Sequence, residues 1–168
     1  VVMLDFLDRV DLGPRTDPEG VAQALDQVAI SCAPHRDLAV NRGKALAISL
    51  ADSNPMLWGG SVLAARAARR VAESVRKAPG RSAVAGDAEH LLPILEATQP
   101  RDVFADPFAP GGSERRPLLL ILDDGAEDAF VRERSGRLQA AAAAAGVRCE
   151  AVTTDAPHEV ARYASLVL

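Results

Sequence analysis

The sequence predicts an α/β domain, a three-layer sandwich whose central parallel sheet is flanked by helices. Residues 117–122 form an unalternating apolar run, which is typical of a strand buried on both faces. Residues 55–58, 82–85 and 147–153 are the other strand candidates. Helix-length segments separate these four strands, and such alternation favours parallel pairing with helices on both faces of the sheet.

The first third of the chain is predicted to be helical. Residues 1–10 carry apolar side chains at helical spacing, and Gly13 with the following proline would end this first helix. Asp17 precedes a proline and a glutamate, the order of an N-cap, an N1 proline and a first-turn acid. The second helix should therefore run to about Ala33, and a third should begin at Asn41.

The middle of the chain alternates between strand and helix. The apolar run 55–58 lies between an Asn-Pro pair and two glycines, which indicates a buried strand. A helix over 61–78 should follow, then a weak strand at 82–85. A short helix is expected at 90–97, with a proline in its first turn, and a surface loop at 100–116.

The last third repeats the strand-helix pattern. After the strand at 117–122, a helix should run from about Ala126 to Ala145, with Gly146 as its C-cap. The strand 147–153 precedes a last helix opened by Pro157. Its apolar face would consist of Val160, Ala161, Ala164 and Leu168. The chain ends within this apolar helix, so we expect further chain to follow.

Composition argues against several classes of protein. The 168 residues are 48% apolar and 25% charged, with a net charge of −4. There is no basic excess of the kind that binds nucleic acid. No apolar run approaches the roughly 20 residues of a membrane span, and the N-terminus does not resemble a signal peptide. We expect a cytoplasmic protein.

The cysteines and histidines do not suggest a metal site. Cys32 and Cys149 are far apart and are expected to be reduced, buried thiols. The three histidines are dispersed and lack the spacing of zinc ligands. We expect neither a metal nor a cofactor.

Ligands of open parallel sheets bind outside the carboxyl ends of the strands. At one such position, Gly59 and Gly60 would let the backbone approach a ligand, and Ser61 would begin a helix whose amides attract phosphate. A tight turn with a serine N-cap is the alternative. No nucleotide-binding glycine motif is present.

A second position clusters Asp87, Glu89 and His90. A carboxylate with an imidazole could transfer protons on a sugar, or this could be a helix start with Asp87 as its N-cap and a solvated histidine. Asp123-Asp124 could hold a cation or ribose hydroxyls, or simply turn from strand to helix. Thr153-Thr154 is a weaker candidate of the same kind.

Four motifs together resemble a known family. They are Asn41-Arg-Gly-Lys44-Ala, Pro55-Met-Leu-Trp58-Gly59, a long helix with Ala68-Arg69-Arg70, and Gly86–His90. This pattern, over roughly residues 20–168, is similar to the C-terminal sugar-isomerase (SIS) domain of bacterial and archaeal dual-specificity phosphoglucose/phosphomannose isomerases. The resemblance implies binding of a sugar phosphate by Gly59, Gly60 and Ser61.

The resemblance also bears on catalysis. His90 matches the family's histidine, and Asp87 stands where the family has a glutamate of the same segment. Arg76-Lys77 occupies the end of the long helix, where the family has its catalytic glutamate. A phosphosugar-binding domain with its catalytic residues partly lost is therefore expected. The alternative is an active aldose–ketose isomerase using His90 with Asp87 or Glu89.

The resemblance further implies a domain plan. Residues 1–16 would be an N-terminal helix and linker, and 17–168 the C-terminal half of a two-domain protein. We expect a homodimer, or pairing with an N-terminal SIS domain. The helix 61–78 and the last helix would supply the apolar interface.

Overall fold

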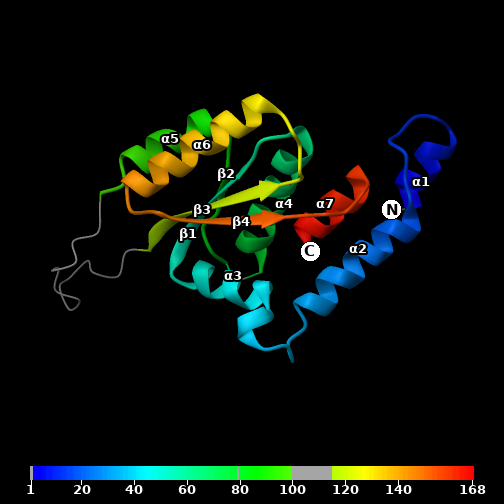
Figure 1. The fold of residues 1–168 in the computed structure, drawn as a ribbon, viewed down its shortest axis with the longest axis horizontal. Coiled ribbons are helices and arrows are strands. Elements are labelled where there is room, and N and C mark those ends of the chain that lie inside the picture. The colour runs from blue at the N-terminus through cyan, green and yellow to red at the C-terminus, as the bar shows by residue number, and fades with distance from the viewer. Residues whose placement is uncertain (1, 79, 100–114) are drawn as a thin grey trace.

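The computed structural model describes residues 2–78, 80–99 and 115–168. Its sheet has four parallel strands in the order β2-β1-β3-β4, which confirms the predicted α/β class. The strands are β1 (Ser53–Gly59), β2 (Val84–Ala85), β3 (Arg116–Asp123) and β4 (Arg148–Thr153). The α-helices are α1 (Val2–Arg9), α2 (Pro18–Ser31), α3 (Arg42–Ala51), α4 (Val62–Lys77), α5 (Ala88–Glu96), α6 (Ala129–Ala144) and α7 (Glu159–Val167) (Figure 1).

Helices cover both faces of the sheet, and β3 explains why its sequence does not alternate. Leu119 and Ile121 point into the core beneath α5 and α6. Leu118 and Leu120 point into the opposite core, beneath α4 and α7. All four side chains are at most 5% exposed. Both faces of β3 therefore have to be apolar.

The predicted helix over 61–78 is confirmed as α4, which lies very close to the sheet. Its buried face is made of alanines, namely Ala64, Ala67, Ala68 and Ala72. A Cβ added at Gly59 would collide with the backbone of Ala64, so the end of β1 requires glycine. Because this apolar face packs on the sheet, it is not available for the subunit interface expected from the sequence.

The edge strand β4 is covered on one face only. Val152 packs beneath α7, whereas Cys149, Ala151 and Thr153 are exposed. The expectation of two buried thiols is therefore wrong, since Cys149 is exposed and Cys32 is half-buried. Both cysteines are free.

Three helices begin at other residues than the sequence indicated, and one of them is α7, which begins at Glu159 and not at Pro157. The helix after β3 begins at Ala129, because Asp128 caps it by accepting a hydrogen bond from the Phe130 amide at 2.8 Å. The helix expected at 90–97 begins at Ala88. Pro93 consequently lies inside α5 and not in its first turn.

The other predicted helix boundaries and apolar faces agree with the structure to different degrees. The third helix was expected to begin at Asn41, and Asn41 is the N-cap of α3, where its side chain accepts from the Lys44 amide at 3.0 Å. The second helix ends at Ser31. On α7, Ala161 is buried, but Leu168 is 65% exposed and does not join the expected apolar face. Most of the loop expected at 100–116 lies outside the described residues.

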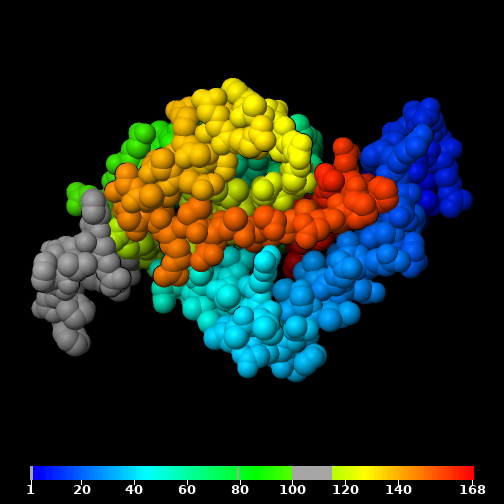
Figure 2. Space-filling model, viewed as in Figure 1, coloured from blue at the N-terminus to red at the C-terminus, as the bar shows by residue number. Residues whose placement is uncertain are grey.

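The N-terminal helices lie beside the sandwich (Figure 1). Helix α2 packs on α7 through a small separate core of Val21, Ala24 and Ala161. Helix α1 has no buried residue and lies at one end of the molecule (Figure 2). The main body of the fold is therefore built from α3 onward.

Candidate functional site at the carboxyl edge of the sheet

All four predicted site stretches follow the carboxyl ends of strands that share one edge of the sheet. Gly59 pairs in register with Leu122, and Asp123 pairs with Thr153. The Gly86 amide donates to the Leu57 carbonyl at 3.3 Å. The chain leaves β1 toward β2 and returns on the other side to β3. The topological switch point, where ligands of such sheets bind, thus lies between β1 and β3.

A serine and an aspartate meet at this switch point. Ser61 is the N-cap of α4, and its Oγ accepts a hydrogen bond from the Ala64 amide at 2.9 Å. The same hydroxyl donates to Asp124 Oδ2 at 2.6 Å. Asp124 is only 8% exposed. The sequence marked these two residues as separate candidates, and the fold joins them across 63 positions.

The Gly60 turn is closed on one side. A Cβ at Gly60 would collide with Val131 of α6 and would come within 2.8 Å of the Trp58 ring. The space beside Gly60 is therefore occupied on that side by the side chains of Val131 and Trp58. A ligand at the turn would have to approach from the side of Ser61 and Asp124.

Asp87 and His90 are exposed to solvent just after the end of β2. Asp87 occupies the N-cap position of α5 without a capping hydrogen bond from its side chain. His90 Nδ1 lies 3.9 Å from Asp87 Oδ2, and the two side chains are 78% and 65% exposed. This arrangement fits the simpler interpretation of the segment, a helix start with a solvated histidine.

Glu89 points to a different partner. Its Oε1 lies 3.1 Å from Arg134 Nη2 on α6, and the Arg134 guanidinium stacks on the Phe130 ring at 4.0 Å. The ion pair ties α5 to α6. Glu89 is therefore engaged with Arg134, while Asp87 faces His90.

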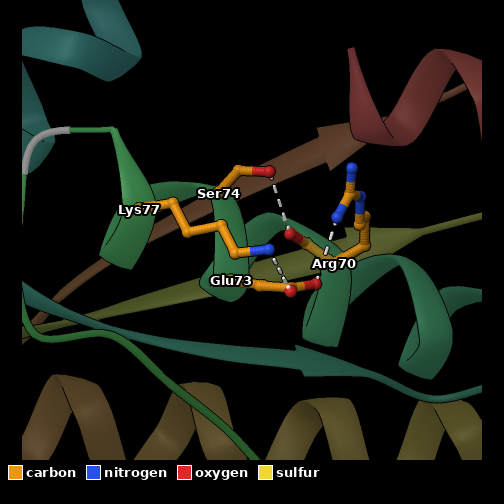
Figure 3. A network of polar contacts seen from close by, with 4 residues as sticks. All are labelled: Arg70, Glu73, Ser74 and Lys77. Carbon is orange, nitrogen blue, oxygen red and sulfur yellow. Dashed lines mark hydrogen bonds and ion pairs between the residues drawn. The ribbon is translucent and has the colours of Figure 1, made fainter.

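Arg76-Lys77, at the position of the family's base, lies at the other end of α4. A 16-residue helix is about 24 Å long, so these cations are far from Ser61. Arg76 Nη1 donates to the Ala83 carbonyl at 2.7 Å. Lys77 Nζ pairs with Glu73 at 2.6 Å, and Arg70 pairs with the same carboxylate at 3.1 Å (Figure 3). The Lys77 and Arg70 hydrogen bonds lower the pKa of Glu73.

Neither a cluster of metal ligands nor a membrane-spanning helix is found among the described residues. No group of three or more His, Cys, Asp or Glu side chains among them is arranged to hold a metal ion. None of the helices in this part of the chain is long and apolar enough to span a membrane.

Comparison with known proteins supports the fold. No protein-family model matches this chain, and no curated protein matches it significantly. One similar solved structure is described as "Putative sugar binding protein from Salmonella typhimurium LT2". It aligns over 89% of this chain with a TM-score of 0.53 and 10% identity. The chain spans only 43% of the length of that protein.

Proposed function

We propose that this chain is an SIS-like domain that binds a sugar phosphate at the switch point between β1 and β3. The observation that carries the proposal is the contact of Ser61 with the buried Asp124 at the N-terminus of α4. A carboxylate and free helix amides side by side suit a ligand that has both hydroxyls and an anionic group. The description of the Salmonella protein as sugar-binding is in keeping with this.

The two ends of the ligand would have different partners. The second oxygen of Asp124 can accept a hydrogen bond from a sugar hydroxyl. The phosphate would bind to the Gly59–Ser61 turn and to the first backbone amides of α4. Asp124 repels an anion at short range, so the phosphate would lie on the far side of Ser61. Inorganic phosphate alone should bind poorly.

Binding can be tested with two substitutions at the switch point. Isothermal titration with glucose 6-phosphate should show weaker binding for Ser61→Ala and for Asp124→Asn. Asp124→Asn should also bind inorganic phosphate more tightly than the wild type does, because a negative charge is removed. Ser74→Ala, on the exposed side of α4, is the matched control. Unchanged affinity in both switch-point variants would refute the proposal.

We further propose that the domain isomerises sugar phosphates slowly or not at all. Proton abstraction tolerates little misplacement, and an error of about 1 Å can cost on the order of 100-fold in rate. His90 and Asp87 are solvated, and Glu89 is paired with Arg134. These facts disfavour the alternative, an isomerase using His90 with Asp87 or Glu89.

A coupled assay for conversion of fructose 6-phosphate to glucose 6-phosphate tests this. We expect no turnover above background. Robust turnover that disappears in His90→Ala and in Asp87→Asn would establish the isomerase instead.

A further inference from the structure

A polar hollow of about 410 Å³ lies between α2 and the segment after β4. Its size falls within the range of small-molecule sites, about 300–1,000 Å³. Gln23 and Gln27 of α2 form one wall, and Thr153 with Asp155 forms part of the other. The hollow is a different place from the Ser61–Asp124 contact, because neither residue lines it.

The two glutamines share one face of α2. They are four residues apart, so their side chains lie above one another on the helix. The opposite face holds Val21, which is buried against α7. Both glutamines are exposed. The Gln23 amide donates to Glu19 Oε1 at 3.3 Å, so Gln27 is the glutamine that we expect to contact a ligand.

Hydroxyl groups line the α7 side of the hollow. Thr154 Oγ1 and Ser165 Oγ lie 2.6 Å apart, and Thr154 also accepts from the Ala156 amide at 3.3 Å. This network ties the segment after β4 to α7. Thr153 and Asp155 then lie on either side of a fixed residue.

Two contacts join α2 to α7, one at the start of α2 and one in its middle. At the start of the helix, Asp17 Oδ2 lies 3.7 Å from His158 Nε2, the N-cap residue of α7. Further along, Ala24 packs against Ala161. The hollow therefore depends on the small core that α2 shares with α7.

The chemistry of the lining selects the ligand class. Amides, hydroxyls and one carboxylate bind hydroxyl groups, and no lysine or arginine is among the described residues that line the hollow. An anion would meet the carboxylate of Asp155, while the neighbouring Arg162 already donates from its Nε to the Ala156 carbonyl at 2.7 Å. We propose that this hollow is a second ligand site that binds an uncharged sugar or polyol.

NMR titration of the labelled protein with glucose and with myo-inositol tests the proposal. We expect at least one of them to shift the amide signals of α2 and of residues 153–156, with glucose 6-phosphate weaker there than glucose. Gln27→Ala and Thr153→Val should each weaken binding of the uncharged ligand about three- to tenfold, as expected for one lost hydrogen bond. Asp155→Asn should bring the affinity of the hollow for glucose 6-phosphate closer to its affinity for glucose.

Two comparisons keep this test separate from the switch-point proposal. Gln139→Ala, at an exposed glutamine of α6, should leave all of these shifts unchanged. Ser61→Ala should leave unchanged the shifts that the uncharged ligands cause in α2 and in residues 153–156. The proposal is wrong if neither uncharged ligand shifts these signals, if glucose 6-phosphate binds the hollow more tightly than glucose, or if Ser61→Ala abolishes the shifts. Each result can occur whether or not a sugar phosphate binds at Ser61.

Discussion

The hydroxyl of Ser61 is fully used within the chain. It accepts from the Ala64 amide and gives its single proton to Asp124. A serine has no second proton to donate, so Ser61 can donate to a ligand only by releasing Asp124. Recognition at the switch point therefore depends on the second oxygen of Asp124 and on backbone amides, and Ser61 contributes by holding Asp124 in place.

Cys149 is an exposed residue of β4, but its sulfur is partly covered and its thiol is less acidic than usual. Burial of the sulfur raises the pKa of Cys149, and the adjacent Glu150 carboxylate raises it further. Because only the thiolate reacts, we expect slow alkylation by iodoacetamide at pH 7, accelerating as pH rises past the ordinary thiol range. Glu150→Gln should speed the reaction by removing a negative charge. The measurement uses Cys32→Ser protein, so that one thiol is followed.

Glu133→Gln on α6 is the control for the Cys149 experiment, since it removes a glutamate remote in sequence from the thiol. Equal rates for Glu150→Gln and Glu133→Gln would mean that the neighbouring carboxylate has no part in the raised pKa.

At the scale of elements, α4 separates its roles between two faces. Its alanines contact the sheet, while Arg70, Glu73 and Lys77 form a network on the solvent side (Figure 3). Their spacing of three and four residues places them side by side. The inner face fixes where Ser61 is held, and the outer face adds a small electrostatic contribution to the helix.

Glu73→Gln should lower the melting temperature slightly at low salt. The pKa of Glu73 is below its ordinary value of 4.5 in the folded protein. Its contribution is therefore present above the unfolded-state pKa and is lost as pH falls through the lowered folded-state pKa. Thermal unfolding by circular dichroism should show the variant and wild type converging in acid.

Salt provides the second check on the Glu73 network. At 1 M salt the Debye length is about 3 Å, and the difference between Glu73→Gln and wild type should disappear. A difference that persists at high salt would indicate that Glu73 acts through packing and not through charge.

The sequence predicted the sheet well because buried strands have a local signature. Residues 118–122 are apolar without alternation, and that follows directly from helices on both faces. The short β2, only Val84–Ala85, was the weakest prediction for the same reason. Helix starts were harder to predict, because aspartate is a common N-cap residue and both Asp124 and Asp128 precede the helix. Only the fold shows that Asp128 caps α6, whereas Asp124 accepts a hydrogen bond from Ser61.

The site was predicted only in part, because its contacts are not local. Each stretch at a strand end could be located from the order of strands and helices. That Ser61 contacts Asp124, and that Glu89 contacts Arg134, depends on which helices lie side by side. The hollow beside α2 joins Gln27 to Thr153, and nothing in either local sequence indicates the other.

At the scale of the whole molecule, we propose that the domain begins near residue 17. Helix α1 buries nothing, although the Thr16 amide donates to Asp8 at 2.7 Å. Deletion of residues 1–16 should leave a single cooperative unfolding transition and an unchanged affinity for glucose 6-phosphate. Loss of cooperativity, followed by circular dichroism, would place α1 within the domain.

Pairing with a second subunit or an N-terminal SIS domain remains our proposal, but at a different surface, because the apolar face expected on α7 is buried against α2 and α4. The alanine face of α4 is occupied by the sheet, whereas Val2, Met3 and Phe6 of α1 are 86%, 70% and 59% exposed. If two copies associate through α1, light scattering should find a dimer for the full chain and a monomer after deletion of residues 1–16. A dimer that survives the deletion would exclude α1.

Helix α2 is attached to the rest of the fold through a small core only. A helix held by Val21, Ala24 and a few half-buried neighbours should open far more often than the leucine-rich sheet does, as an independent unit of local unfolding. Its backbone amides should then exchange with deuterium at a free energy well below that of global unfolding. A ligand bound to Gln27 would have to dissociate before α2 opens. Its binding should therefore slow the deuterium exchange of the backbone amides of α2 alone.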